Sequence, residues 1–131
     1  MHSPDSLVIL VSAEPDSVMG RHVLPFCLAA LYNYTLQRIF FYGAGVYHAQ
    51  QRFPPPDEMR PEIRWQPLVD AGVDLVVCVS AALRRGVLDT EQALLLQQPG
   101  ATLLPGFRLG GLAELAESYH IASRRLHFPS T

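Results

Sequence analysis

Cys78 is the residue of this sequence with the clearest potential for chemistry. It lies in LVVCVSAALRRGV, residues 75–87, between an apolar run and a small-residue segment that ends in two arginines. A thiolate is a strong nucleophile and takes part in thiol exchange when its sulfur is accessible. Free cysteine is also among the residue types most often buried in a core. Two interpretations therefore stand for Cys78: a reactive thiol or a small core residue.

The residues after Cys78 favour reactivity. If a strand ends there and a helix follows, the unpaired amides of the first helical turn stabilise a thiolate. Ser80 and the alanines at 81–82 are small enough to leave access to the sulfur. Arg84 and Arg85 add positive charge about one helical turn away. With these arguments, a reactive thiol and a core residue are equally well supported for Cys78. The residues alone do not decide between the two interpretations.

The second cysteine, Cys27, has different surroundings. It lies between Phe26 and Leu28 in an apolar segment without a nearby charge, so we predict a core residue. Two cysteines with no CxxC spacing predict neither a disulfide scaffold nor a zinc site. They are typical of reduced thiols in the cytosol.

Alternating strands and helices must position these side chains. Strands are predicted at 6–13, 38–45, 73–80, 101–107 and 121–128. Helices are predicted within 14–34 and at 62–72, 81–87, 88–100 and 108–120. The helix within 14–34 has about 15 residues and can start late, near Pro25. Gly72 ends the helix at 62–72, and Asp89 or Thr90 is the N-cap of the helix at 88–100. This alternation predicts an α/β protein. Its form would be a three-layer α/β/α sandwich with a mostly parallel sheet of about five strands, flavodoxin-like in character, in one domain spanning 1–131.

In such sheets, reactive groups gather at the carboxyl ends of the strands, which is where Cys78 is expected. Tyr42 and Tyr47 follow the neighbouring strand, so they can line the mouth of a cysteine site, although packing explains them equally well. Gly43 and Gly45 form a GxG without the third glycine or ribose-binding acid of a dinucleotide site. We interpret the two glycines as a tight turn.

Composition limits the classes of function. With a net charge of −2, 49% hydrophobic and 17% charged residues, and a mean hydropathy of +0.14, the chain is globular and has no broad basic surface for nucleic acid. The five histidines form no HExxH pair, and no GxSxG is present, so neither metal binding nor a serine hydrolase is predicted. No apolar run reaches about 18 residues and the N-terminus lacks a basic segment, which predicts a soluble, untargeted protein without membrane contact.

Three segments carry a family resemblance. FFYGAGVYHA (40–49), CVSAALRRGV (78–87) and PGFRLGGLAELAE (105–117) resemble, in order and spacing, the DsrE/TusD family of sulfur-relay proteins. The resemblance covers nearly the whole chain and implies a DsrE-like domain. Residues 14–19 and the proline-rich 53–61 differ from the usual family loops.

The resemblance implies a cytoplasmic sulfurtransferase subunit in which Cys78 carries a persulfide, with no metal or organic cofactor. It implies sister TusB/TusC-like (DsrF/DsrH-like) subunits in a hexamer, a TusA-like donor and a TusE/DsrC-like acceptor. The sulfur would serve tRNA wobble 2-thiouridine synthesis or, alternatively, sulfur oxidation. Arg84, Arg85, Tyr42 and Tyr47 are the candidate substrate-binding residues. Other hypotheses are a non-catalytic scaffold subunit and, from the GxG turn, a nucleotide or flavin binder; homo-oligomers are also possible.

Overall fold

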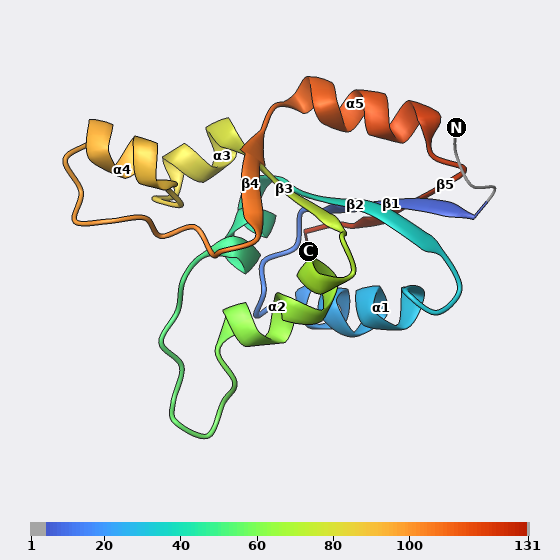
Figure 1. Cartoon of the computed structure of the whole chain (residues 1–131), viewed down its shortest axis with the longest axis horizontal. Helices are drawn as coiled ribbons and strands as arrows, with labels where there is room; N and C mark the ends of the chain where they lie inside the picture. Colours follow the sequence, from blue (N-terminus) through green and yellow to red (C-terminus); the bar gives the residue numbers. More distant parts are fainter. Residues whose placement is uncertain (1–4, 131) are drawn as a thin grey trace.

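A computed structural model describes residues 5–130 of the chain (Figure 1). Its core is one five-stranded, all-parallel sheet with the order β4-β3-β2-β1-β5. The strands are β1 (Ser6–Val11), β2 (Thr35–Phe41), β3 (Asp74–Cys78), β4 (Phe107–Gly110) and β5 (Arg124–Phe128). The helices are α1 (Val23–Ala30), α2 (Pro61–Asp70), α3 (Val79–Arg84), α4 (Thr90–Leu95) and α5 (Leu112–Ile121), with 3-10 helices η1 (Gly20–His22) and η2 (Gly43–Ala49).

The layers follow from the order of the strands. β1 to β4 step across the sheet in one direction, and the chain then returns to place β5 beside β1. Right-handed crossovers put the connection to β5 on the face opposite the earlier ones. Accordingly, α5 covers one face and α1 and α2 the other, while α3 and α4 extend beyond the end of the sheet (Figure 1). The predicted three-layer sandwich is confirmed, with an order that differs from the 2-1-3-4-5 of flavodoxin.

The prediction of a strand at 101–107 is wrong. β4 begins only at Phe107, and residues 101–106 approach it as a loop held by an isolated bridge between Gln50 and Leu103. Gly106 has φ +88°, which no strand residue adopts, and Pro105 before it lacks an N–H for pairing. The apolar residues of this segment therefore belong to the loop that precedes β4.

Helix boundaries depend on caps and prolines. α1 has eight residues and begins at Val23, so Pro25 falls in its first turn, where a missing N–H is tolerated. Asp89 is the N-cap of α4, and its carboxylate accepts a hydrogen bond of 2.8 Å from the amide of Gln92, as predicted. Gly72, with φ +79°, follows the end of α2.

The core lies on both faces of the central strands. Its largest fully buried side chains include Ile9, Ile39, Phe40, Phe41, Leu68 and Leu75. Cys27 is fully buried among them from α1, which confirms the prediction of a core residue. Burial raises the pKa of its thiol to about 12, so Cys27 stays protonated.

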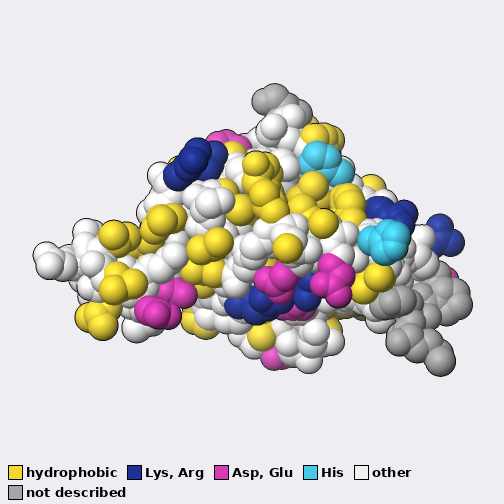
Figure 2. Space-filling model, turned by 90° about the horizontal axis from the view of Figure 1, so that it is seen from above, with side chains coloured by type: hydrophobic (Ala, Val, Ile, Leu, Met, Phe, Trp, Pro, Cys, Tyr) yellow, Lys and Arg dark blue, Asp and Glu magenta, His cyan; other side chains and the backbone are white. Residues whose placement is uncertain are grey.

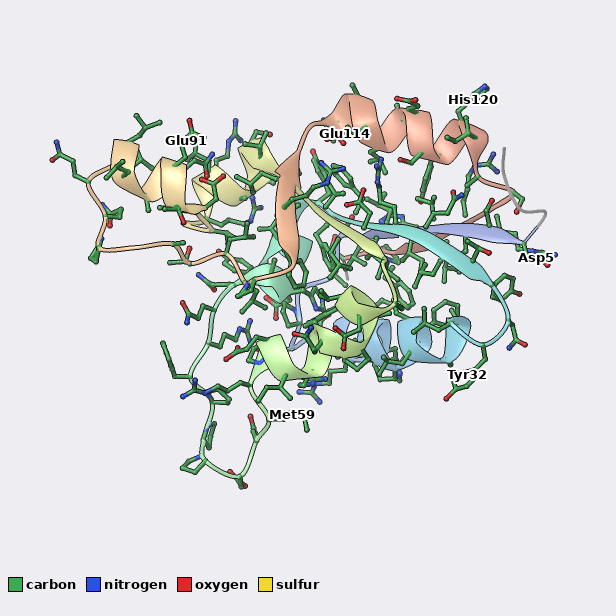
Figure 3. All side chains as sticks on the ribbon, in the orientation of Figure 1. Asp5, Tyr32, Met59, Glu91, Glu114 and His120 are labelled. Atoms are coloured by element: carbon green, nitrogen blue, oxygen red, sulfur yellow. The ribbon has the colours of Figure 1, made fainter. Side chains whose placement is uncertain are left out.

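An ion-pair network, which the sequence did not indicate, fixes α5 over the sheet. Arg38 of β2 and Arg108 of β4 both donate to the Asp74 carboxylate at the start of β3, at 2.9 Å. Arg108 also pairs at 2.7 Å with Glu114 (labelled in Figure 3), in the first turn of α5. Arg38 reaches the hydroxyl of Ser118 one turn later. Side chains from three strands and one helix thus join the sheet to its covering helix.

Across residues 5–130, no helix is both long and apolar enough to cross a bilayer. The sequence-based expectation about targeting rests partly on residues 1–4, which lie outside the described residues.

Candidate functional site

Cys78 stands at a junction with no intervening loop. It is the last residue of β3 and the N-cap residue of α3. In the sheet, its Cα is paired with that of Gly110, the last residue of β4. The predicted location of Cys78 at the carboxyl edge of a parallel sheet is thereby confirmed.

The register places Cys78 on the face covered by α5. Side chains alternate along a strand, so Cys78 continues the side of Asp74 and Val76. Asp74 contacts Arg108, which binds α5, and a Cβ added at Gly110 would overlap both Val76 and the Glu114 carboxylate. A side chain opposite Cys78 would therefore require Val76 or the Glu114 carboxylate to shift.

The sulfur lies just below the surface. Cys78 is 1% exposed, whereas Ser80 two residues later is exposed, and its hydroxyl oxygen lies 3.5 Å from the Cys78 sulfur. The sequence predicted small residues that leave the sulfur open, but in the isolated chain Cys78 is covered. A reaction at this thiol therefore requires a local movement that exposes the sulfur.

Arg84 and Arg85 lie at the other end of α3 from Cys78. Six residues at 1.5 Å per residue separate the ends of this helix by about 9 Å, close to the screening length at physiological salt. Arg85 donates a hydrogen bond of 3.1 Å to the carbonyl of Ala81, and Arg84 is exposed without an ion pair among residues 5–130. Neither arginine contacts the sulfur, so direct stabilisation of a thiolate is not the role that this geometry supports.

Tyr42 and Tyr47 come from the neighbouring strand end. β2 ends at Phe41, which is paired with Val77, so Tyr42 is level with Cys78 along the sheet edge. Tyr42 is exposed, and Tyr47 is partly buried within η2, which packs against β3 and α3. Within the described part of the chain, no hydrogen bond or ring contact joins either tyrosine to Cys78. Both tyrosines thus come from the segment that follows β2 at the carboxyl edge of the sheet.

The GxG is a tight turn, as predicted. Gly43 has φ +55° and opens η2, while Gly45 packs against the end of β1, where its Cβ would overlap the carbonyl of Val11. This close approach places η2, and with it the two tyrosines, at the carboxyl edge of the sheet.

Replacing Gly45 with Ala is expected to destabilise the fold by about 1–3 kcal/mol, because the added methyl group must displace η2 from β1. Urea unfolding measures this loss. Gly100, where an added Cβ meets nothing, is the matched control, and Gly100→Ala is expected to leave the midpoint nearly unchanged. Equal midpoints for the two variants would contradict the packing argument.

Among residues 5–130, no three histidine, cysteine, aspartate or glutamate side chains form a group that could hold a metal ion. The chemistry that the edge of the sheet offers is that of a single thiol at the end of a parallel strand.

The fold and the site together define a class of protein: a parallel α/β domain with a cysteine at a strand-to-helix junction. The model of the DsrE/DsrF-like family matches residues 5–128, and the chain belongs to that family.

Curated relatives cover most of the chain. Sulfurtransferase TusD of Cronobacter sakazakii is 46% identical over 98 residues, which are 73% of this chain and 77% of the relative. Sulfurtransferase TusD of Pectobacterium atrosepticum is 45% identical over 98 residues, 73% of this chain and 76% of the relative. In fold, the chain is similar to the crystal structure of the ychN protein from E. coli, with a TM-score of 0.72 and 19% identity over 94% of this chain and 97% of that one.

Proposed function

We propose that this chain is a sulfurtransferase subunit that accepts a sulfane sulfur on Cys78 as a persulfide and passes it to a small acceptor protein. The observation that carries the proposal is the position of Cys78, at the carboxyl end of β3 and the start of α3, in a chain about 45% identical to relatives named sulfurtransferases. Buried Cys27, whose thiol stays protonated, is unsuited to the same role.

The chemistry is thiol exchange in two steps. The Cys78 thiolate attacks the outer sulfur of a donor persulfide; the donor S–S bond breaks, the donor leaves as a thiolate, and Cys78 becomes a persulfide. An acceptor thiolate then attacks that outer sulfur, and Cys78 leaves as a thiolate. Each step forms one S–S bond and breaks another, so no external oxidant or reductant, metal or organic cofactor is needed.

Residues around the thiol have separate proposed roles. The Ser80 hydroxyl lies 3.5 Å from the Cys78 sulfur and can donate a hydrogen bond to it during transfer. Tyr42 and Tyr47 form the rim on the η2 side, and exposed Arg84 and partly exposed Arg85 supply charge for binding an acidic protein surface. In this account the arginines bind the partner that brings or takes the sulfur, and do not act on Cys78.

A hydrophobic surface beside the site fits sister subunits. We call the exposed hydrophobic residues of α3, of α4 and of the position after α4 the leucine surface: Val79, Leu83, Leu94, Leu95 and Leu96. Leu94 and Leu95 are 79% and 75% exposed, and hydrophobic side chains gather at the end of the molecule that α4 forms (Figure 2). Exposed apolar patches of this kind mark protein contacts. TusB/TusC-like (DsrF/DsrH-like) chains are the proposed occupants.

Replacing Leu94 with Asp is expected to prevent assembly, because a charge would be buried at the contact. Native mass spectrometry after co-expression with the sister chains measures the loss of the oligomer. Val18→Asp, at a residue 76% exposed and outside the leucine surface, is the control that should assemble normally. Assembly of Leu94→Asp at the level of the control would contradict this use of the surface.

The full relay places a TusA-like donor before this subunit and a TusE- or DsrC-like acceptor after it, in the cytoplasm, with tRNA wobble 2-thiouridine as the final product. Sulfur trafficking in sulfur oxidation is the alternative destination. The near-complete burial of Cys78 favours one second candidate, a scaffold subunit that carries no sulfur. In that case Cys78 would resist alkylation in the assembled complex.

The test is transfer of labelled sulfur through the assembled complex. A donor persulfide labelled in its outer sulfur is incubated with the complex, and the acceptor is then added. The proposal predicts label first on this chain and then on the acceptor. Label that reaches the acceptor without passing through this chain would support the scaffold instead.

A further inference from the structure

A cavity separate from the thiol opens on the α1 and α2 side of the sheet. It has a volume of about 610 Å³ and lies between the loop after β1, the end of η2, the proline-rich segment 52–60 and α2. Met59, labelled in Figure 3, is part of its lining. Cavities of this size hold small organic ligands. Cys78 faces the opposite side of the sheet, so the sulfur chemistry does not use this cavity.

Three arginines from separate segments line the cavity. Arg21 comes from η1, Arg52 follows η2, and Arg64 lies on α2. Arg52 is paired with Asp16 at 3.5 Å, whereas Arg21 and Arg64 form no ion pair with any residue in 5–130. The remaining acid of the lining, Glu58, is exposed on the proline-rich segment. Two guanidinium groups are therefore available to an anion.

His48 supplies a buried polar group at the same cavity. It is 8% exposed, and its Nε2 lies 3.0 Å from the carbonyl oxygen of Ala13, so Nε2 carries the proton and donates. Burial lowers the pKa of His48 to about 4, and the charges of Arg52 and Arg64 add to this shift. The ring is neutral at pH 7. Its Nδ1 is then an acceptor, and it has no hydrogen-bond partner among the described residues.

The rest of the wall is apolar. Leu24 of α1 and Trp65 of α2 line the cavity together with prolines of the two loops. Trp65 is 4% exposed and packs edge-to-face against Phe41, with ring centroids 5.6 Å apart, so its position is set by the core. A ligand would thus meet fixed aromatic and aliphatic surface beside the charged groups.

We propose that this cavity binds a small phosphorylated molecule that also carries a hydroxyl group. Arg21 and Arg64 bind the phosphate, whose several oxygens match guanidinium groups arriving from different directions. His48 Nδ1 accepts a hydrogen bond from the hydroxyl, and the carbon frame lies on the apolar wall. Arg52 stays with Asp16 at the edge. The site is independent of the proposed sulfur relay.

The test uses the full chain and three probes: inorganic phosphate, ribose 5-phosphate and ribose. Calorimetry gives the affinities, and the ring signals of His48 and Trp65 in NMR spectra report the location. We expect saturable binding of both phosphates with ring signals that shift, tighter binding of ribose 5-phosphate, and binding of ribose weaker by roughly tenfold or more. No saturable binding of either phosphate would overturn the proposal, as would ribose binding as tightly as ribose 5-phosphate.

A double variant, Arg21→Gln with Arg64→Gln, removes two exposed charges without touching the core. It is expected to bind ribose 5-phosphate at least about tenfold more weakly while melting at an unchanged temperature. Arg60→Gln is the matched control, since Arg60 pairs with Glu62 and does not line the cavity. Equal affinity of the double variant and the control would overturn the assignment of the arginines.

Discussion

Replacing Cys78 with Ser is expected to abolish the acceptance of labelled sulfur, with a loss of at least about a hundredfold in rate. A serine hydroxyl stays protonated at neutral pH and cannot form a persulfide. The substitution changes one atom at a position that is 1% exposed, so the fold should remain intact, and circular dichroism checks this. The measurement is the transfer of labelled sulfur from donor to acceptor through the assembled complex.

Cys27 provides the internal control for that experiment. Cys27→Ala removes the other thiol of the chain from a fully buried site in α1. It is expected to lower stability modestly but to leave sulfur acceptance at the wild-type level in the folded protein. Retained transfer in Cys78→Ser, or lost transfer in folded Cys27→Ala, would contradict the assignment of the carrier.

Replacing Asp74 with Asn is expected to destabilise the protein by about 2 kcal/mol. The Asp74 carboxylate accepts hydrogen bonds from both Arg38 and Arg108, and the substitution leaves these two guanidinium groups without their shared anion. Because Asp74 is 32% exposed, solvent limits the loss. Urea unfolding measures it, with Asp57→Asn, at an exposed loop position, as the control.

The same network predicts how stability varies with pH. Partial burial by itself raises the pKa of Asp74, but the hydrogen bonds from Arg108 and Arg38 outweigh it, so the pKa lies below its ordinary value of 3.8. A carboxylate whose pKa is lowered in the folded state contributes stability above its unfolded pKa. That contribution is lost as the pH falls below about 4 and through the folded pKa. Asp74→Asn should therefore lose less stability than wild type between pH 5 and pH 2, and equal losses would contradict the network.

The central strands were predictable from the sequence because they are buried on both faces. SLVILV and DLVVC are continuous apolar runs, which local composition identifies. β4 has only four residues, FRLG, and one of them is Arg108, which belongs to the ion-pair network with Asp74. Composition therefore favoured the more apolar residues 101–106 that precede β4. The edge strand therefore depends on tertiary pairing with β3 more than on its own residues.

The candidate site was predictable only in part. The position of Cys78 follows from the end of an apolar run, but its pairing with Gly110 of β4, more than 30 residues later, is not visible in the local sequence. Arg84 and Arg85 are close to Cys78 in the sequence, yet the helix carries them to its other end. Asp74 pairs with Arg108, and His48 lines the same cavity as Arg64. These residues lie on separate segments, and no local pattern indicates that they come together.

The central claim, that Cys78 carries the sulfur, is tested most directly by mass spectrometry of the intact chain after incubation with a persulfide donor. The account predicts a gain of one sulfur atom, removed by a reducing thiol, with peptide mapping that places the added mass on Cys78. The gain should persist in Cys27→Ala and be absent from Cys78→Ser. No added sulfur on the wild-type chain, or added sulfur that persists in Cys78→Ser, would contradict the account.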